Sequence, residues 1–171
     1  MKNILLIGFM GCGKTNVGKM IAARLGKTFM DTDELIESRW ERPIGSIISQ
    51  KGETFYRKQE GEALKSLLGK KNIVVATGGG EVDLEETWNR MRQIGLIVYI
   101  SNTPAILADH IEQGQHHEWL DGTEEGHEGI LDRVKKMLDA RHPQYYRADI
   151  IVEAGDLTYQ QLCDYIVARV P

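Results

Sequence analysis

The sequence predicts an α/β fold, a three-layer α/β/α sandwich around a mostly parallel sheet. Short apolar segments alternate along the chain with segments of helical periodicity, which is the pattern of repeated βαβ units. A glycine-rich turn joins the first apolar segment to the first helical one. The chain has 171 residues, a length that suits one domain with its own core. We therefore expect residues 1–171 to form a single domain.

The first half of the chain supplies three strands and the helices between them. Apolar runs predict the strands, and apolar residues at helical spacing predict the helices, which stop at glycine or proline. In chain order we expect a strand over 3–9, a helix over 15–25, a strand over 28–30, helices over 33–68 that break near Pro43 and Gly52, and a strand over 72–76.

The second half repeats this alternation. Pro104 stands in the first turn of a predicted helix, where proline is tolerated. Residues 113–129 are polar, contain glycine and show no periodicity, so they indicate a loop. In chain order we expect a helix over 84–93, a strand over 96–100, a helix over 103–112, the loop, a helix over 130–141, a strand over 149–152 and a helix over 158–170.

Composition excludes several classes of protein. Hydrophobic residues make up 42% of the chain and charged residues 27%, the balance of an ordinary globular protein rather than a disordered one. The net charge of −4 offers no basic surplus for nucleic acid, and no apolar run is long enough for a membrane span. Cys12 and Cys163 form no disulfide or metal-binding pattern, so we expect a cytoplasmic protein.

The segment from Gly8 to Thr15 matches the pattern G-x-x-x-x-G-K-[ST] of a phosphate-binding loop. It lies between a predicted strand and a predicted helix, where backbone N–H groups and the helix N-terminus bind phosphate oxygens. We expect Lys14 to reach the β- and γ-phosphates and the Thr15 hydroxyl to bind Mg²⁺. The candidate nucleotide-binding residues are Gly11, Cys12, Gly13, Lys14, Thr15 and Asn16.

This loop indicates a nucleoside triphosphate but not one class of enzyme. The chain has no N-K-x-D guanine motif, and its length leaves little room for the extra elements of a motor ATPase. A kinase of a small molecule or a nucleotide remains. Cys12 lies near a helix N-terminus, which favours a reactive thiolate; the alternative is a small residue tolerated in a tight loop.

Four further motifs follow the phosphate loop. The first and third follow predicted strands, the second lies in a predicted helical stretch, and the fourth precedes the last predicted strand. In chain order they are Asp31-Thr32-Asp33, Gly52-Glu53-x-x-Tyr56-Arg57-x-x-Glu60, Gly78-Gly79-Gly80 and Arg141-x-Pro143-x-Tyr145.

In this order and at this spacing, the motifs resemble the shikimate kinase family over nearly the whole chain. The resemblance implies a fold like that of nucleoside monophosphate kinases, with a five-stranded parallel sheet in the order 2-3-1-4-5. It also implies transfer of the γ-phosphate of ATP to the 3-hydroxyl of shikimate, a step of aromatic amino-acid biosynthesis. The expected partners are ATP, Mg²⁺ and shikimate, with no nucleic acid and no membrane, and we expect a monomer.

The resemblance implies a role for each matched residue. Lys14 and Asp33 are the catalytic candidates, with Asp33 as the base that also binds the shikimate hydroxyls. Asp31 holds Mg²⁺ through water, together with Thr15. A carboxylate substrate calls for guanidinium groups, because arginine pairs with a carboxylate through two hydrogen bonds. The implied substrate-binding residues are Asp33, Arg57, Gly78, Gly79, Gly80 and Arg141.

Taken one at a time, these residues have plainer interpretations. Asp33 is also a common helix N-cap residue, and Arg57 and Arg141 are also compatible with helix surfaces. Three successive glycines are also compatible with a strand-to-helix turn. Glu60 either orients Arg57 or is a solvated carboxylate.

The chain departs from the family pattern in the lid, which we place near residues 112–128, opposite a substrate-binding part near 33–62. The family carries an R-P-L-L motif where this chain has residues 117–120, and an earlier arginine where it has Asp109. Residues 93–132 contain no Lys or Arg. Ile48 and Tyr56 stand where the family often has phenylalanine.

Three explanations of the missing arginines remain open. A basic residue from beyond the lid reaches in (Arg133, Lys136 or Arg147). Alternatively, a histidine supplies the positive charge (His116, His117 or His127), with activity rising as the pH falls. In the third explanation the chain acts on another polyhydroxy acid such as gluconate, or is a weakly catalytic nucleotide-binding paralogue. A metal site made of His110, His116, His117 and His127 matches no standard zinc spacing.

Overall fold

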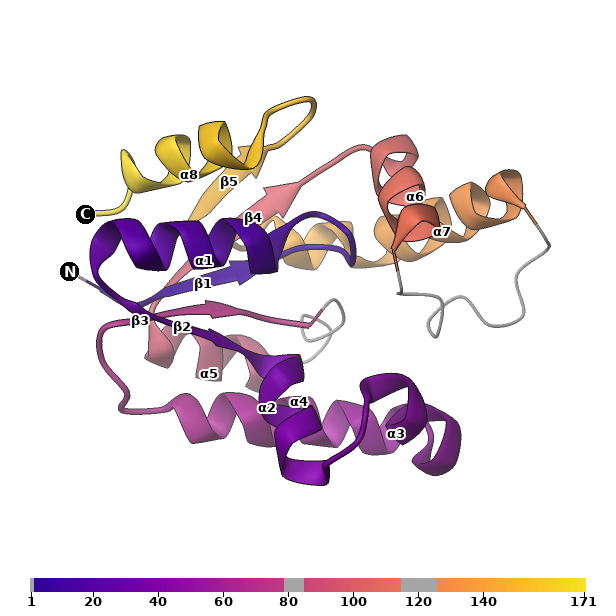
Figure 1. Ribbon diagram of the computed structural model, residues 1–171, viewed down its shortest axis with the longest axis horizontal. Helices are drawn as coiled ribbons and strands as arrows, with labels where there is room; N and C mark the ends of the chain where they lie inside the picture. Colours follow the sequence, from indigo (N-terminus) through magenta and orange to yellow (C-terminus); the bar gives the residue numbers. More distant parts are fainter. Residues whose placement is uncertain (1, 79–84, 115–125) are drawn as a thin grey trace.

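Five parallel strands form one sheet in the order β2-β3-β1-β4-β5 (Figure 1). The structure is a computed structural model, and it describes residues 2–78, 85–114 and 126–171. The strand order and the parallel pairing confirm the fold class expected from the sequence. The strands are β1 (Ile4–Ile7), β2 (Thr28–Asp31), β3 (Ile73–Ala76), β4 (Leu96–Ser101) and β5 (Ile150–Glu153).

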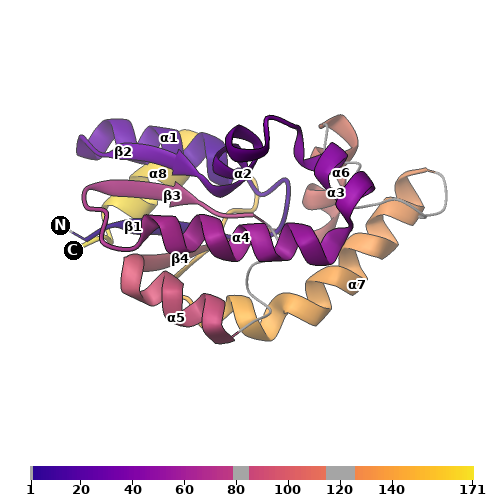
Figure 2. The ribbon, with the colours of Figure 1, turned by 90° about the horizontal axis from the view of Figure 1, so that it is seen from below.

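Helices cover both faces of this sheet. Figure 2 shows α1 and α8 over one face, with α5 and α4 over the other, so the molecule has the three expected layers. Within the described ranges no helix combines the length and the apolar character needed to cross a membrane. The helices are α1 (Lys14–Leu25), α2 (Thr32–Trp40), α3 (Ile44–Lys51), α4 (Glu53–Leu67), α5 (Glu85–Ile94), α6 (Pro104–Gln113), α7 (His127–Tyr145) and α8 (Tyr159–Val167).

The central strand β1 fixes where the site lies. Its four apolar residues are fully buried, as expected for a strand with helices on both faces. It pairs with β3 on one side and β4 on the other, so the chain first builds the sheet on the β3 side of β1 and then crosses from β3 to β4 on the other side. In an open parallel sheet, this arrangement leaves a crevice beyond the carboxyl end of the central strand, where the phosphate loop begins.

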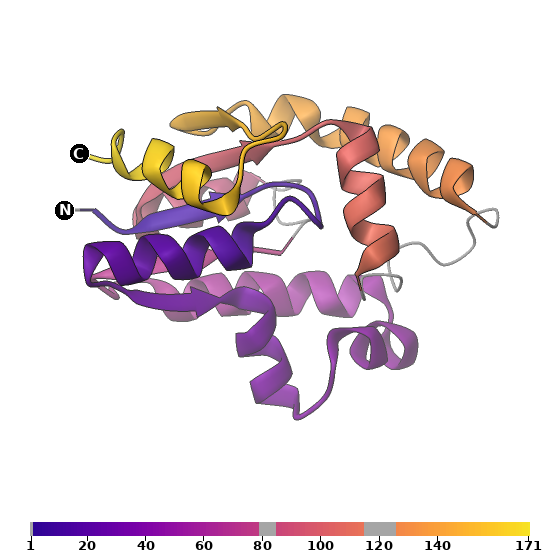
Figure 3. The same cartoon turned by 45° about the horizontal axis from the view of Figure 1, so that its top comes forward.

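Two groups of helices flank this crevice. Figure 3 shows α2 and α3 on one side of the strand ends and α6 and α7 on the other. The α2–α3 side has a small core of its own, in which Ile36, Ile44, Ile47 and Ala63 pack around the ring of Tyr56. Because this core joins α2 and α3 to α4, the side chains of these helices are held toward the crevice.

The helix α7 is longer than the sequence indicated. It begins at His127, so the expectation of a loop through residue 129 is wrong at its end. It also runs beyond Arg141 and through Pro143 to Tyr145. Proline removes one N–H from the helix, but the buried ring of Tyr145 stacks on Tyr99 with 4.7 Å between ring centroids. This packing holds the last turn in place.

Candidate active site

A cleft of about 740 Å³ lies at the carboxyl ends of β1, β2 and β3. Side chains from α2, α4, α6 and α7 complete its walls. It brings the phosphate loop together with the residues expected to bind the acceptor. Of the site residues inferred from the sequence, the following line it: Gly11, Gly13, Lys14, Thr15, Asn16, Asp31, Asp33, Arg57, Gly78 and Arg141.

The phosphate loop ends at Gly13, the N-cap of α1, which has a φ of 93°. A Cβ atom at this position would lie 2.8 Å from the ring of Tyr159, so glycine is required here for two reasons. No side chain caps α1, which leaves the N–H groups of its first turn available to an anion. The ammonium of Lys14 donates to the carbonyl oxygens of Gly8 at 2.7 Å and Phe9 at 3.0 Å.

Three of the expected site residues are not among the residues that line the cleft: Cys12 lies away from it, and Gly79 and Gly80 are not described by the structure. Cys12 is 3% exposed and does not line the cleft. Its Sγ lies 3.7 Å from the Lys14 ammonium, on the inner side of the loop. This position fits the interpretation of Cys12 as a small residue in a tight loop. Gly79 and Gly80 lie outside the described residues.

Asp31 connects the two sides of the cleft. Its Oδ2 accepts a hydrogen bond from the Thr15 hydroxyl at 2.9 Å, and its Oδ1 accepts one from the Asp33 backbone N–H at 2.9 Å. The N-cap of α2 is therefore Asp31, and the interpretation of Asp33 as the helix cap is wrong. The two residues expected to hold Mg²⁺, Thr15 and Asp31, lie in direct contact.

Asp33 stands in the first turn of α2 and also lines the cleft. The hydroxyl of Tyr56 donates to its Oδ1 at 2.6 Å. Burial raises the pKa of Asp33, and this hydrogen bond acts in the opposite direction. Between the two aspartates, the buried hydroxyl of Thr32 accepts a hydrogen bond from the Gly78 N–H at 3.0 Å. The ends of β2 and β3 are thus fixed to each other beneath the site.

Half-buried Arg57 and buried Glu60 form an ion pair beside Asp33. Arg57 donates to Glu60 Oε2 at 3.0 Å and to Glu53 Oε1 at 3.1 Å. Glu60 is 2% exposed, so of the two interpretations of this residue the solvated carboxylate is wrong. Among the described residues, no group forms a hydrogen bond with Glu60 Oε1. Burial raises the pKa of Glu60 to about 7, although Arg57 lies beside it.

Gly78 has no side chain because these carboxylates approach it closely. A Cβ atom at Gly78 would lie 2.6 Å from Glu60 Oε1, 3.1 Å from the Tyr56 hydroxyl and 3.4 Å from Asp33 Oδ1. Arg141 lines the cleft from α7. It is 8% exposed, and its guanidinium carbon lies 5.6 Å from the centroid of the Phe9 ring. Arg141 is therefore not a helix-surface arginine.

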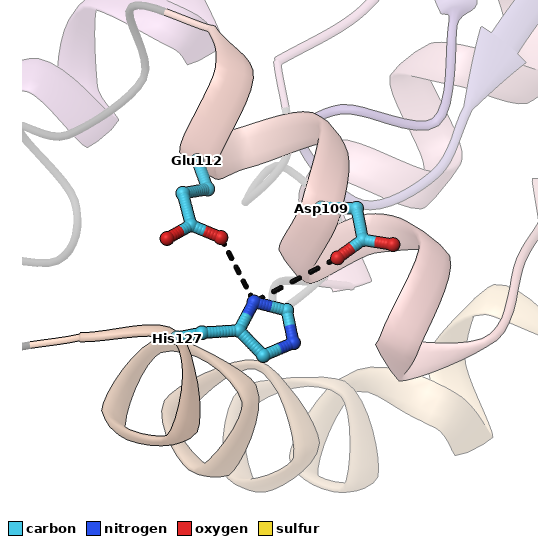
Figure 4. A group of neighbouring side chains, drawn as sticks. All are labelled: Asp109, Glu112 and His127. Atoms are coloured by element: carbon cyan, nitrogen blue, oxygen red, sulfur yellow. Dashed lines mark hydrogen bonds and ion pairs between the residues drawn. The ribbon is translucent and has the colours of Figure 1, made fainter.

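The structure describes two of the four histidines that were considered as sources of positive charge or as metal ligands. His110 lies on α6, and its Nδ1 is 2.8 Å from the Gly11 carbonyl oxygen of the phosphate loop. His127, at the start of α7, lies between the carboxylates of Glu112 and Asp109, at 2.8 and 3.7 Å (Figure 4). The hydrogen bond to Glu112 raises the pKa of His127. His116 and His117 lie outside the described residues.

The basic residues expected to reach in from beyond the lid lie elsewhere. Arg147 bonds both oxygens of Glu85 at 2.8 and 2.9 Å and lies over the ring of Trp88. Lys136 pairs with Asp132, and Arg133 is exposed on α7. None of these three lines the cleft. In the described part of the chain, the Lys and Arg side chains that line it are Lys14, Arg57 and Arg141.

Several cleft residues had no assigned role at the level of the sequence. Ile48 packs against the α2–α3 core, and the apolar side chain that lines the cleft there is Ile44. Tyr56, His110 and Tyr159 also line the cleft. Each of these three residues contacts a residue at least 23 positions away in the sequence, so no local motif contains both partners. The one available signal was that Tyr56 occurs where the resembling family often has phenylalanine.

Comparison with known proteins decides the family. The sequence profile of the family described as "Shikimate kinase" matches residues 10–171. The chain belongs to the shikimate kinase family. It is 36% identical to the shikimate kinase of Thermodesulfovibrio yellowstonii over 167 residues, and this alignment covers 98% of this chain and 94% of that protein. It is 33% identical to the shikimate kinase of Caldanaerobacter subterraneus subsp. tengcongensis over 98% of this chain and 95% of that protein.

Solved shikimate kinase structures show the same fold. The chain matches the enzyme of Acinetobacter baumannii in complex with shikimate with a TM-score of 0.87 at 28% identity, over 98% of this chain and 91% of that one. It matches the enzyme of Aquifex aeolicus with a TM-score of 0.76 at 32% identity, over 97% and 94%. The family and its full-length relatives support shikimate kinase activity, which uses ATP. They favour this activity over the two alternatives that the lid had suggested, a gluconate kinase and a weakly catalytic paralogue.

The buried carboxyl of Glu60 makes stability depend on pH in a defined direction. Its folded-state pKa lies above the ordinary value of 4.5, so the folded state binds its proton more tightly, and stability is lost as the pH rises from about 4.5 through 7. Glu60→Gln removes this dependence. Between about pH 5 and pH 8, we expect the unfolding free energy of the wild type to fall by about 1–3 kcal/mol relative to this variant.

Urea unfolding at a series of pH values measures this difference. Glu53→Gln is the matched control, because Glu53 bonds the same arginine but is exposed. A wild-type stability that runs parallel to that of Glu60→Gln across the range would contradict the assignment.

Proposed function

We propose that this cleft transfers the γ-phosphoryl group of ATP to the 3-hydroxyl of shikimate, giving shikimate 3-phosphate and ADP. The observation that carries the proposal is the composition of the cleft wall. A phosphate loop with Lys14 shares one cavity with a half-buried carboxylate, Asp33, and two guanidinium groups, Arg57 and Arg141. Phosphoryl transfer needs positioning and neutralisation of charge, and these groups supply both for a donor that is a polyphosphate and an acceptor that is a hydroxy acid.

On the donor side, the N–H groups of the loop and the Lys14 ammonium hold the phosphates of ATP. Thr15 and Asp31 are the residues that would hold Mg²⁺, with Thr15 as a direct ligand and Asp31 through water. Their hydroxyl and carboxylate oxygens, 2.9 Å apart, are the hard donors that this ion prefers. When bound, Mg²⁺ neutralises charge on the β- and γ-phosphates.

On the acceptor side, Arg57 and Arg141 bind the carboxylate of shikimate, and Asp33 binds its hydroxyls. Asp33 takes the proton of the 3-hydroxyl as that oxygen forms its bond to the γ-phosphorus and the bond to ADP breaks. Glu60 holds the Arg57 guanidinium from the buried side, which fixes its direction. The shikimate complex of the Acinetobacter baumannii relative supports this acceptor.

We propose that the working unit is one chain in the cytoplasm. Residues 33–62 form the proposed shikimate-binding part, and residues 112–128 the proposed lid. We propose no contact with nucleic acid.

Shikimate-dependent release of ADP from Mg-ATP tests the function. We expect ADP to form with shikimate and to remain at background with gluconate or without an acceptor. Because Asp33 must be ionised and burial raises its pKa, we expect the rate to fall at the acidic end of a pH profile. A rate that is higher at about pH 6 than at about pH 8 would support histidines in the place of lid arginines. Equal ADP release with and without shikimate would overturn the proposal.

Asp33→Asn tests the proposed base. A positioned base contributes about 10²–10⁴ in rate, so we expect kcat to fall by about that factor while the Kd for ATP stays within about twofold. Asp156→Asn, the same change at an exposed position, is the control. Calorimetry for ATP and the ADP assay for turnover give the two readouts, and near-normal turnover in Asp33→Asn would exclude the role.

Lys14→Met tests the phosphate loop. Hydrogen bonds to a charged group are worth about 1.5–3 kcal/mol, so we expect the Kd for ATP to rise about 10- to 100-fold, with turnover falling as well. Lys136→Met, at an exposed position on α7, should leave both unchanged. Calorimetric titration with Mg-ATP measures the affinity, and unchanged ATP binding in Lys14→Met would place the nucleotide elsewhere.

A further inference from the structure

Tyr56 has two parts with different surroundings. Its ring packs in the α2–α3 core among Ile36, Ile44, Ile47 and Ala63, and the residue as a whole is 1% exposed. Its hydroxyl leaves that core and reaches the cleft wall, where it donates to Asp33 Oδ1 at 2.6 Å. A phenylalanine ring would fill the same apolar space, so packing accounts for the ring but not for the hydroxyl.

We propose that Tyr56 is a positioning residue for phosphoryl transfer, whose hydroxyl fixes Oδ1 of Asp33 and leaves Oδ2 to receive the proton of the acceptor hydroxyl. This inference rests on the proposed function. Within the described ranges, Asp33 Oδ2 has no protein hydrogen-bond partner, and Asp33 lines the cleft. The hydrogen bond therefore divides the carboxylate into an anchored oxygen and a free one.

The anchor matters because Asp33 lies in a largely anionic and buried place. A carboxylate there is held in its charged form by the donors that reach it and opposed by desolvation and by nearby negative charge. Tyr56 supplies a donor, whereas Lys14 acts as a more distant cation. The charged and titratable groups that face Asp33 are Lys14 on α1, Asp31 at the end of β2, Glu37 on α2, and Tyr56, Arg57 and Glu60 on α4.

The surroundings of Glu60 support the same role for the Tyr56 hydroxyl. Its Oε1 has no hydrogen-bond partner in the described part of the chain, and it lies with the Tyr56 hydroxyl and Asp33 Oδ1 around the Cα of Gly78. The Tyr56 hydroxyl lowers the pKa of Glu60 as well as that of Asp33. One hydroxyl is thus placed between the buried carboxyl of Glu60 and the half-buried carboxylate of Asp33, and it donates to Asp33, which lines the cleft.

Tyr56→Phe removes the hydroxyl and keeps the ring. We expect kcat to fall several-fold, because the Asp33 carboxylate is free to rotate without its hydrogen bond. The KM values for shikimate and for ATP should stay within about twofold of the wild-type values, because the variant keeps the ring and the groups that bind both ligands. Tyr99→Phe is the control, because Tyr99 is an equally buried tyrosine on β4 that does not line the cleft.

A second readout separates this inference from the proposed function. The ¹³C carboxyl resonance of Asp33, assigned by its loss in Asp33→Asn, is recorded at one pH, about 8, in the ligand-free wild type, Tyr56→Phe and Tyr99→Phe. We expect its chemical shift to change in Tyr56→Phe alone, because the carboxylate loses the hydrogen bond to the Tyr56 hydroxyl. An unchanged chemical shift and an unchanged kcat in Tyr56→Phe would overturn the role of Tyr56 even if shikimate is turned over. Absence of shikimate turnover in the wild type would overturn the proposed function, while the chemical shift would still decide whether the Tyr56 hydroxyl holds Asp33.

Discussion

The carboxylate of Asp31 is the interaction on which the site depends. One of its oxygens binds the hydroxyl of Thr15 in the phosphate loop, and the other caps α2 through the N–H of Asp33. A helix cap and a loop contact made by one side chain fix the first turn of α2 relative to the first turn of α1. Since Asp33 stands in that first turn, the distance between the acceptor side and the phosphate side of the cleft is set by a single residue.

Around this anchor, the structure places one carboxyl group, Glu60, in a buried position and another, Asp33, in a half-buried position at the cleft wall. Burying a carboxylate is unfavourable unless it is paired and hydrogen-bonded. Glu60 receives Arg57 on one oxygen only, and Asp33 receives Tyr56. In a dry environment such hydrogen bonds and charges act more strongly than in water. The α2–α3 core provides that environment, so the second small cluster of apolar residues serves the chemistry as well as the packing.

Much of the fold and of the site was accessible from the sequence because its signals were local. The phosphate loop is a contiguous motif, and strictly apolar β1 and β3 predict central strands. The start of α7 and its passage through Pro143 were not accessible, because the stacking of Tyr145 on Tyr99 depends on packing between distant segments. The same holds for the contact of His110 with Gly11, 99 residues apart. Capping of α2 was considered for Asp33 as an alternative to its catalytic role and not for Asp31, since both are equally good cap residues and only the strand end decides between them.

The resting position of Lys14 has a consequence for ligand choice. Its ammonium already has two carbonyl partners, Gly8 and Phe9, so a ligand gains only the difference between its own attraction and theirs. A neutral ligand offers little more than a carbonyl does and leaves the side chain where it lies. A polyphosphate carries enough negative charge to draw the ammonium away. The two backbone carbonyls that hold Lys14 therefore make the phosphate loop favour anions over neutral ligands.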